Sequence, residues 1–436
     1  MKYEEVLDYL EINVNKLGSV MGLVTIRELL RRMGNPQETL QFIHVAGTNG
    51  KGSVSTFLAE GLMANGYKIG RYISPVITDY REKIQVNNKH VTKTFVADCL
   101  TELFRISKEM EAEGFAHPTA FELETAMAFA YFRDKKCDYV VLECGMGGAE
   151  DATNVIPSPK LCVFTEISMD HEAILGDTPE KIAMVKSGIL KPGTAMVSAK
   201  QTEEVAQVLA KACGNLGITP HFADPLSAKK IKSTLKSEQF SYDVYQNVKI
   251  PLLGAHQREN AILALLAFRV LKELGVALKD DKILAGFMNA KWPGRFEILG
   301  KKPYIIADGA HNEAAVKKLM ETLRFHFTNQ RIVYIMGVLK DKDYSCMIQD
   351  SCDMAEYIVT VTPPIRHRAL PAFELAGEIR KYHPNVTAAD SIEEALEMAT
   401  LLAGPEGVVL AFGSLSYLGA FRTACENRER NKGGIK

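Results

Sequence analysis

One recurring pattern constrains the fold of this chain more than any other. A short apolar run rich in β-branched residues is followed by a turn containing glycine and then by a stretch with helical periodicity. Residues 40–46 (LQFIHVA) are the first example, since they end at Gly47 and helical spacing follows over residues 53–64. The runs 138–142 and 160–167 repeat the pattern. Because continuous apolar strands that alternate with helices form mostly parallel sheets covered on both faces, we predict an α/β protein.

A second series of the same kind follows residues 291–295 (KWPGR), which are the best candidate for a linker. Its strand-like runs are 304–308, 331–338, 357–361 and 407–412, and helical stretches such as 312–325 and 391–403 separate them. Residues 224–250 are rich in lysine, serine and other polar residues, so we expect a strand-and-loop elaboration of the first unit. At ~150 residues per domain, 436 residues correspond to about three domains, so the length allows between one and three. We predict two α/β domains, residues 1–293 and 294–436, with a cleft between them.

Composition excludes several classes of protein. Hydrophobic residues make up 47% of the chain and charged residues 24%, which rules out a mainly disordered chain. The 52 lysines and arginines almost balance the 53 acidic residues, so no overall field attracts nucleic acid or an anionic membrane surface. No apolar run approaches the ~18–20 residues that cross a bilayer. The acidic, amphipathic N-terminus also lacks the apolar core of a signal peptide.

The eight cysteines include no CxxC pair, which in a chain of this length indicates reduced, mostly buried thiols. We therefore expect a cytoplasmic, monomeric protein that acts on small molecules and has no nucleic-acid or membrane partner.

The strongest single motif is the glycine-rich segment 47–53 (GTNGKGS), which follows a predicted strand and opens a predicted helix. Glycines let backbone N–H groups turn toward an anion, and the helix N-terminus adds a favourable partial charge. Lys51 can then reach the outer phosphates of a nucleotide, and the Ser53 hydroxyl can contact Mg²⁺. The strict pattern G-x-x-x-x-G-K-[ST] is not met, because Val45 replaces its first glycine and Gly52 separates lysine from serine. The alternative is an ordinary strand-to-helix turn, but we predict nucleotide binding.

Two further polar groups lie at predicted strand ends. Glu143 follows the run 138–142, and Asp170 and His171 follow the run 160–167. Ligands of open parallel sheets bind at the carboxyl ends of the strands, so these side chains should lie beside the phosphate loop. A glutamate, a neutral histidine and a serine hydroxyl together suit Mg²⁺. Taken alone, His171 is as readily explained as a hydrogen-bonded loop histidine.

Lys186 is unusual because its predicted helix, residues 178–190, surrounds it with apolar residues. The side chains on its face are Ile182, Ala183, Ile189 and Leu190. A lysine in such surroundings must extend its amine to solvent, find a partner, shift its pKa or lose its charge by modification. The sequence pattern alone favours extension to solvent.

In the second half, residues 308–312 (DGAHN) again lie between a predicted strand and a predicted helix. Arg295, Asn260 and Ser414 are further polar candidates that could face a nucleotide or carboxylate across the cleft. Each of these residues taken singly also fits a structural role, since Asp-Gly is a common turn and His311 could cap the next helix.

Taken together, these segments resemble the folylpolyglutamate synthase/dihydrofolate synthase family of the Mur-ligase superfamily. The resemblance extends from near the N-terminus to Arg422 and rests on an ordered series of motifs. These are GNPQ (34–37), HVAGTNGKGS (44–53), Ser74-Pro75, EKIQVNN (82–88), Phe121-Glu122, GMGGAEDATNV (145–155), MDHEAILG (169–176), KSGILKPG (186–193), LLGAHQREN (252–260), WPGRFEI (292–298), DGAHN (308–312) and GSLSYLGAFR (413–422).

The resemblance implies an ATP-dependent ligase that joins L-glutamate to a pteroate or folate carboxyl group. ATP would phosphorylate the acceptor carboxylate, and the glutamate amine would attack the resulting acyl phosphate. Positioning and charge neutralisation, which such a reaction needs, are what a phosphate loop and Mg²⁺ supply. The implied fold is a P-loop-containing, mostly parallel sheet domain followed by a smaller Rossmann-like α/β domain.

The resemblance also implies roles for individual residues. ATP would be held by Asn49, Gly50, Lys51, Gly52, Ser53, Asn260, Arg295 and Asp308. Mg²⁺, with two sites plausible, would be surrounded by Ser74, Glu143 and His171. The acceptor would contact Phe121, Glu122 and Asp151. Residues with catalytic roles would be Lys51, Lys186, His311 and Ser414, the last two helping to hold glutamate. Lys186 matches a family lysine that is carbamylated, which favours modification over extension to solvent.

Two departures from the family pattern concern the acceptor. Val76 stands where the family usually has histidine after Ser-Pro, and Ala149-Glu150 precede Asp151 where an arginine is usual. One alternative is therefore a Mur-type or other amino-acid ligase with a non-folate acceptor. A P-loop kinase or nucleotide switch would leave residues 308–312 and Ser414 unexplained. An inactive binding protein is disfavoured because Lys51, Glu143, His171 and Lys186 are all present. The sequence does not separate dihydrofolate synthase from folylpolyglutamate synthase activity.

Overall fold

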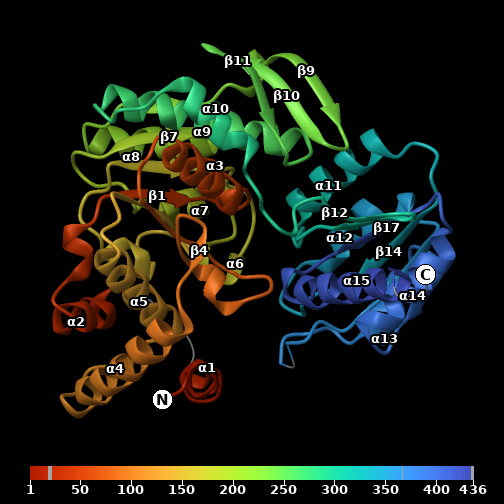
Figure 1. Cartoon of the computed structure of the whole chain (residues 1–436), viewed down its shortest axis with the longest axis horizontal. Coiled ribbons are helices and arrows are strands. Elements are labelled where there is room, and N and C mark those ends of the chain that lie inside the picture. The colour runs from red at the N-terminus through yellow and green to blue at the C-terminus, as the bar shows by residue number, and fades with distance from the viewer. Residues whose placement is uncertain (18–21, 366, 434–436) are drawn as a thin grey trace.

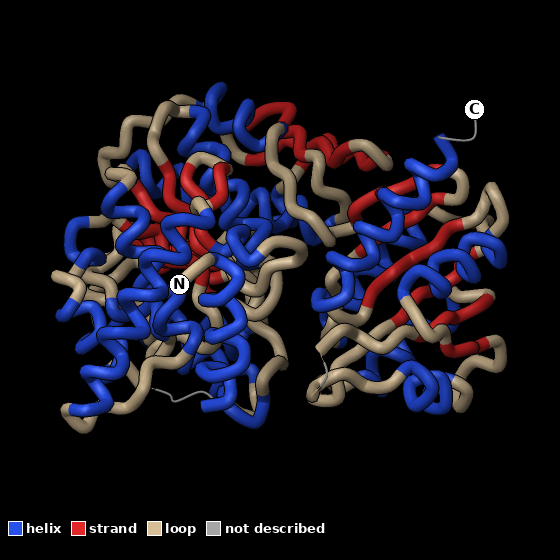
Figure 2. The backbone as a smooth tube through the Cα atoms, turned by 60° about the horizontal axis from the view of Figure 1, so that its bottom comes forward, coloured by secondary structure: helices blue, strands red, loops and turns tan. Residues whose placement is uncertain are grey.

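The computed structural model describes residues 1–17, 22–365 and 367–433, and two bodies rich in both helix and strand make up the molecule (Figure 1). The last three residues of the predicted second domain, 434–436, lie outside the described part. Figure 2 shows one group of strands in each body, with helices around it, and a further group of strands at the top of the view. Within the described ranges, no helix is long and apolar enough to cross a membrane.

The larger sheet has eight strands in the order β4-β3-β2-β5-β1-β6-β7-β8. Its strands are β1 Phe42–Ala46, β2 Ile69–Tyr72, β3 Ile84–Val86, β4 Lys89–His90, β5 Tyr139–Glu143, β6 Leu161–Phe164, β7 Ala195–Ser198 and β8 Pro220–Phe222. The six neighbouring strands from β2 to β8 in this order are parallel to one another. β3 and β4 follow β2 as antiparallel strands at one end of the sheet. β1 thus lies between β5 and β6, whose carboxyl ends flank the loop that follows it.

Helices cover both faces of this sheet because side chains alternate along each strand. Ile43 and Val45 pack with helices α3, α9 and α10, whereas Phe42 packs on the other face with α1, α2, α4 and α5. α7 and α8 cover the β6 and β7 side of the sheet. The helices are α1 Tyr3–Tyr9, α2 Val24–Arg32, α3 Lys51–Ala64, α4 Lys93–Ala112, α5 Ala120–Asp134, α6 Glu172–Leu175, α7 Pro179–Ser187, α8 Glu203–Asn215, α9 Ala255–Glu273 and α10 Asp280–Met288.

A separate antiparallel sheet of three strands has the order β11-β10-β9. Its strands are β9 Lys229–Thr234, β10 Ser237–Tyr242 and β11 Tyr245–Ile250, so the strands expected within residues 224–250 are confirmed. Phe240 and Val248 pack into the core that contains α3 and α9, while Leu235, in the β9–β10 turn, packs against the core of the second body. This sheet therefore contacts both bodies.

The second body contains six strands in the order β12-β13-β17-β14-β15-β16, all parallel except the antiparallel edge strand β12. The strands are β12 Glu297–Lys301, β13 Tyr304–Ala307, β14 Ile332–Met336, β15 Tyr357–Thr360, β16 Val386–Ala388 and β17 Val408–Phe412. One face packs against α11 Glu313–His326, α12 Tyr344–Ser351 and α13 Ala372–Ile379. The other face packs against α14 Ile392–Ala403 and α15 Leu418–Gly433.

Short helical turns complete the chain. They are η1 Leu10–Val14, η2 Asn15–Leu17, η3 Pro36–Thr39, η4 Tyr80–Lys83, η5 Ala152–Val155, η6 Pro225–Ser227, η7 Cys352–Met354 and η8 Leu415–Tyr417. The predicted α/β fold class, with two mostly parallel sheets, is confirmed. The helix predicted over residues 178–190 is too long, because α7 ends at Ser187 before Gly188.

Candidate active site

The phosphate loop connects the end of β1 to the start of α3, and two of its glycines are required by their surroundings. Gly47 has φ +146° and Gly50 has φ +89°, in the left-handed region that favours glycine. A Cβ on Gly47 would lie 1.9 Å from Thr165 Oγ1, and one on Gly50 would lie 2.5 Å from Asn260 Oδ1. The loop is therefore fitted closely against the β6 end and the N-terminal turn of α9.

Gly52 departs from the strict nucleotide-loop pattern for a packing reason. A Cβ at this position would lie 2.2 Å from Trp292 Cζ2, so only glycine lets the tryptophan of the segment joining the two bodies reach the start of α3. The guanidinium of Arg71 lies over the same Trp292 ring, 5.8 Å from its centre. The extra glycine thus ties the phosphate loop to the connecting segment.

Two buried oxygens at the loop, Ser53 Oγ and Glu143 Oε2, have no hydrogen-bond partner among the described residues. Burial raises the pKa of Glu143 to about 7, although Lys51, Arg295 and Arg71 each lower it. The Lys51 amine donates to the carbonyls of Gly47 and Thr48, at 3.1 Å each, within its own loop. Free oxygens next to a phosphate loop are suited to a hydrated divalent cation that also binds phosphate oxygens.

Ser74 and His171 line the same cavity as Ser53 and Glu143. Burial lowers the pKa of His171, which favours the neutral imidazole. Within the described part of the chain, no group of three or more histidine, cysteine or acidic side chains could hold a metal by itself. A metal at this place would therefore need serine and phosphate oxygens as further ligands. Such a mixed set of ligands suits Mg²⁺, which commonly binds protein and phosphate oxygens together.

Lys186 is buried, with 5% of its surface exposed, so extension of the amine to solvent is ruled out. Its Nζ donates to the Gly47 carbonyl at 2.9 Å, directly beneath the phosphate loop. Burial and the neighbouring charge of Lys51 lower the pKa of the Lys186 amine to about 7. A sizeable fraction of this lysine is therefore the neutral amine at physiological pH.

The loop after β5 contains Asp151, whose carboxylate is held by the protein. Asp151 Oδ2 accepts from the Met146 N–H at 2.8 Å, and Oδ1 accepts from the Thr153 N–H at 2.9 Å. Nearby, the Phe121 ring packs so closely on Gly145 that a Cβ there would lie 2.5 Å from Phe121 Cζ. The Glu122 carboxylate accepts from the backbone and hydroxyl of Thr119 in a capping box that starts α5.

The second body contributes a group of polar residues at the ends of β13 and β17. Asp308 accepts from the Phe296 and Ala310 N–H groups at 2.7 and 2.8 Å. His311 Nδ1 lies 2.8 Å from the Gly309 carbonyl, and burial lowers the pKa of His311 to about 4, so this imidazole is neutral. Arg295 Nη1 donates to the Gly294 carbonyl, and Ser414 Oγ lies 2.8 Å from Ser416 Oγ.

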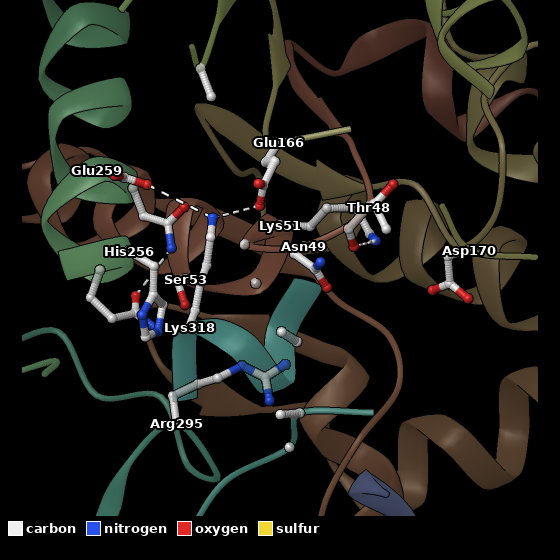
Figure 3. A pocket seen from close by; sticks show the side chains of 18 of the residues that line it. Thr48, Asn49, Lys51, Ser53, Glu166, Asp170, His256, Glu259, Arg295 and Lys318 are labelled. Carbon is white, nitrogen blue, oxygen red and sulfur yellow. Dashed lines mark hydrogen bonds and ion pairs between the residues drawn. The ribbon is translucent and has the colours of Figure 1, made fainter. Parts of the chain in front are cut away.

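Two cavities bring most of the predicted site residues together. The first, of about 470 Å³, is lined by residues 48–53, Glu143, the first turns of α9, Arg295 and residues 308–311 (Figure 3). The second, of about 620 Å³ and with more apolar walls, is lined by Phe121, Glu122, Asp151 and residues 413–416. Residues that line both cavities are Ser74, Pro75, Gly145, His171, His311 and Leu415. Lys186 lies beneath the loop and lines neither cavity.

Polar contacts that the sequence did not indicate join the two bodies. Lys318 of α11 pairs with Glu166 at 2.6 Å and with Glu259 at 3.8 Å, as Figure 3 shows. Lys342 pairs with Asp170 at 2.6 Å. Asn49 and Asn312 hydrogen-bond to each other through both amides, at 3.1 and 3.3 Å. Apart from Lys318 and Glu259, the residues of each pair are more than 150 positions apart in the sequence. No local sequence pattern could therefore have indicated these contacts.

Comparison with known families defines the class to which this arrangement belongs. Residues 45–268 match the middle domain of Mur ligases, and residues 294–415 match the Mur ligase glutamate ligase domain. A phosphate loop in a mostly parallel sheet, followed by this second α/β body, therefore makes the chain a Mur ligase.

Individual relatives narrow the class. The dihydrofolate synthase/folylpolyglutamate synthase of Bacillus subtilis (strain 168) is 33% identical over 416 residues, which cover 93% of this chain and 95% of the relative. The folylpolyglutamate synthase of Lacticaseibacillus casei is 32% identical over 433 residues, with 97% and 98% covered. A structure of Mycobacterium tuberculosis folylpolyglutamate synthase with ADP and AMPPCP superimposes with a TM-score of 0.88 at 30% identity, covering 97% of this chain and 99% of that one. The chain belongs to the folylpolyglutamate synthase/dihydrofolate synthase family.

Proposed function

We propose that this protein is an ATP-dependent ligase that joins L-glutamate to the carboxyl group of a pteroate or folate. The observation that carries the proposal is the pair of cavities with a common wall, one at the phosphate loop and the other more apolar and lined by both bodies. A nucleotide in the first cavity and an aromatic acceptor in the second would meet at Ser74, Gly145 and His311. Relatives that carry folylpolyglutamate synthase names support the same assignment.

ATP would lie in the first cavity. Its phosphates would be bound by the backbone of Asn49, Gly50, Gly52 and Ser53 and by the Lys51 amine, which would exchange its loop carbonyls for phosphate oxygens. Asn260, Arg295 and Asp308 line the same cavity and would contact the remainder of the nucleotide. Arg295 would add a positive charge close to the developing negative charge of the leaving phosphate.

Mg²⁺ would be surrounded by Ser74, Glu143 and His171, and the Ser53 hydroxyl would contact it as well. The unpartnered oxygens of Ser53 and Glu143 fit such an ion. When bound, it would neutralise charge on the phosphate oxygens during transfer. Because burial raises the pKa of Glu143, its ionised form should depend on this positive charge.

Lys186 is proposed to carry a carbamate. Its neutral amine nitrogen would form a bond to the carbon of CO₂ and release one proton, leaving an anionic carbamate. The lowered pKa of Lys186 supports this step, because only the unprotonated amine has a free electron pair. The product would replace a buried cation with oxygens that can approach a second Mg²⁺ site near the phosphate loop.

In the reaction itself, an oxygen of the acceptor carboxylate attacks the terminal phosphorus of ATP, and ADP leaves. The glutamate amine then attacks the acyl carbon, an amide bond forms and inorganic phosphate leaves. His311 and Ser414 would hold the glutamate, because both line the second cavity from the second body. Phe121, Glu122 and Asp151 would contact the acceptor on the opposite wall, which excludes water from the acyl phosphate.

We also propose that the domains divide at residues 293 and 294, with residues 291–295 as the hinge of a cleft that closes during turnover. The reason is that the phosphate and glutamate elements come from different bodies. We also propose a cytoplasmic location, which the eight unpaired cysteines support, and a monomeric state.

A second candidate keeps the ligase chemistry but changes the acceptor. Val76 and Glu150 both line the second cavity, so the two departures from the family pattern lie where an acceptor would bind. Glu150 would place a negative charge near the acceptor and favour one that carries hydrogen-bond donors or positive charge.

The deciding experiment measures ADP release by the purified protein with Mg²⁺, ATP and L-glutamate, adding dihydropteroate or tetrahydrofolate in separate reactions. Mass spectrometry checks each product for one added glutamyl unit. Product from either acceptor supports the proposal and separates the two folate activities. ADP release that ignores glutamate would point to a kinase, and glutamate-dependent turnover only with other carboxylates would favour the second candidate.

A further inference from the structure

Two buried polar side chains that the proposed reaction does not use, His44 and Thr153, form a hydrogen-bonded chain that ends at Asp151 of the second cavity. It begins at His44 in β1, which is fully buried and lines neither cavity. His44 Nε2 lies 2.9 Å from Thr153 Oγ1 and 3.0 Å from Cys144 Sγ. Its other ring nitrogen, Nδ1, is buried without a hydrogen-bond partner. A histidine in this position needs an explanation, because a buried unpaired nitrogen is costly.

Thr153 continues the chain to Asp151. Its hydroxyl oxygen lies 2.5 Å from Asp151 Oδ1, in addition to the Thr153 N–H that donates to the same oxygen. With the Met146 N–H on Oδ2, three protein donors converge on the Asp151 carboxyl group. Burial raises the pKa of Asp151 above its ordinary value, and these hydrogen bonds limit the rise. Several donors to one buried carboxyl group favour its ionised form.

The direction of the chain follows from the number of protons. If Asp151 is ionised, the single hydroxyl proton of Thr153 is donated to Asp151, so Thr153 Oγ1 has only acceptor capacity left for His44. His44 Nε2 must then carry a hydrogen and donate it. Burial lowers the pKa of His44 to about 3, so the ring is neutral and Nδ1 carries no proton. The unpartnered Nδ1 is therefore an acceptor without a donor.

We infer that His44 and Thr153 are positioning residues for Asp151, the carboxylate that contacts the folate acceptor. Through Thr153, His44 keeps Asp151 ionised and aimed into the second cavity, where Asp151 accepts hydrogen bonds from N–H groups at the edge of a pterin-like ring. The inference deepens the proposed function and rests on it. A residue on β1, three positions before the phosphate loop, thus contributes to acceptor affinity without touching the acceptor.

Paired substitutions test the chain. His44→Gln and Thr153→Ser keep the donating group, whereas His44→Leu and Thr153→Val remove it at similar size. We expect His44→Gln and Thr153→Ser to have the acceptor KM of the wild type. His44→Leu and Thr153→Val should raise the acceptor KM about tenfold or more, as loss of a hydrogen bond to a charged group predicts. The kcat and the KM for ATP should stay within about twofold, because Asp151 contacts the acceptor rather than the nucleotide.

Thr400→Val is the matched control, since the buried Thr400 hydroxyl donates only to backbone carbonyls of α14 in the second body. Thermal unfolding identifies any variant that fails to fold. If His44→Leu does not fold, Thr153→Val tests the same chain, because it keeps the shape of the side chain. Equal losses in Thr153→Ser and Thr153→Val, or a fall in kcat at unchanged acceptor KM, would overturn the inference.

A second readout needs no substrate. Nitrogen-15 NMR of histidine-labelled protein, with His44→Gln to identify the signal, reports which ring nitrogen carries the proton. A hydrogen on Nε2 supports the chain, and a hydrogen on Nδ1 overturns it whatever the activity. A wild type that neither binds nor converts any folate would instead remove the proposed function, so the two failures are distinguishable.

Discussion

At the scale of single residues, Gly52 is the point where the phosphate loop and the segment between the two bodies meet. Because a Cβ there would lie 2.2 Å from the Trp292 ring, Gly52→Ala must displace either the tryptophan or the start of α3. We expect a loss of unfolding free energy of about 1–3 kcal/mol, typical of overpacking, and weaker ATP binding. Calorimetric unfolding and nucleotide titration measure both.

Gly214→Ala in α8 is the matched control for this prediction. Gly214 also lies in a helix, but apart from the adjoining backbone of that helix no atom of the described residues lies within 4 Å of the position of a Cβ. Alanine should therefore be neutral or stabilise the protein by up to about 1 kcal/mol. Equal effects of the two substitutions would show that the Trp292 contact is not what requires glycine at position 52.

Lys186→Ala is expected to reduce turnover at least about a hundredfold while ATP affinity changes only a few-fold. The reason is that Lys186 lies beneath the phosphate loop and lines neither cavity, so its proposed carbamate would act on charge during transfer. Steady-state kinetics and nucleotide titration check this. Turnover of the wild type should also fall in buffers freed of CO₂ and recover when bicarbonate is added. Unchanged turnover in the variant would remove the carbamate proposal.

The lowered pKa of Lys186 also predicts how stability varies with pH. The amine has a pKa of about 7 in the folded protein and about 10.5 when unfolded, so between these values the unfolded chain binds more protons. The free energy of unfolding therefore rises with pH across this window, by at most about 1.4 kcal/mol per unit, and is unaffected below it. Urea unfolding of wild type and Lys186→Met at pH 7, 8 and 9, without CO₂, should show the wild type gaining relative to the variant. A constant difference would mean that the folded amine stays charged.

At the scale of elements, the three-stranded sheet is joined to α9 by a buried ion pair. Glu238 of β10, which is fully buried, pairs with Arg258 at 2.8 Å and accepts from the Gly254 N–H. Four residues of the same turn of α9, His256, Gln257, Glu259 and Asn260, line the nucleotide cavity. Glu238 therefore fixes a helix end that ATP is proposed to contact.

Glu238→Ala should destabilise the protein by about 3–5 kcal/mol, because the mostly covered Arg258 guanidinium and the Gly254 N–H would lose their buried acceptor. A double substitution, Glu238→Leu with Arg258→Leu, should recover most of this loss, since the remaining side chains are apolar. Urea unfolding measures both variants. If the double substitution were no more stable than Glu238→Ala, packing rather than the unpaired charge would explain the loss.

The elements that sequence analysis predicted are those with clear hydrophobic periodicity. The strands corresponding to β1, β5, β6, β13, β14, β15 and β17 all lie within or next to the predicted runs. The antiparallel strands β3, β4 and β12 escaped prediction because they are short or polar and lack a clear apolar run. α7 was predicted too long because Ile189 and Leu190 continue its apolar pattern, although they are buried beyond its end.

At the scale of the whole molecule, three polar contacts hold the two bodies together around the nucleotide cavity. Burial alone would raise the pKa of Asp170, but the Lys342 ammonium lowers it to about 2, so this pair persists at neutral pH. Replacement of both Lys318 and Lys342 by methionine should loosen the contact and increase the radius of gyration measured by X-ray scattering. Lys317→Met with Lys381→Met is the control, because those lysines pair within their own body. Identical scattering from both double variants would contradict this role.

The site was predictable only where a motif carries the chemistry. The phosphate loop, Glu143, His171 and residues 308–312 were found because each follows a strand, and parallel strands bring their ends to one edge. The family and its ligase activity were likewise recognised from the ordered motifs. Individual residue roles remain predictions. Glu166, Lys318 and Lys342 were missed because ion pairs between distant segments leave no periodic signal, and the His44 chain was missed because a histidine inside an apolar strand resembles any other buried residue.

The wall common to the two cavities has a consequence for inhibitor chemistry. Six residues face both spaces, so a single molecule that joins a nucleotide-like group to a pterin-like group could pass this wall and occupy both sites at once. The second group would then bind at the high effective concentration set by a short linker, and its affinity would far exceed that of either half. Such a compound would also be selective, because enzymes that recognise only nucleotides or only folates offer just one of the two anchors.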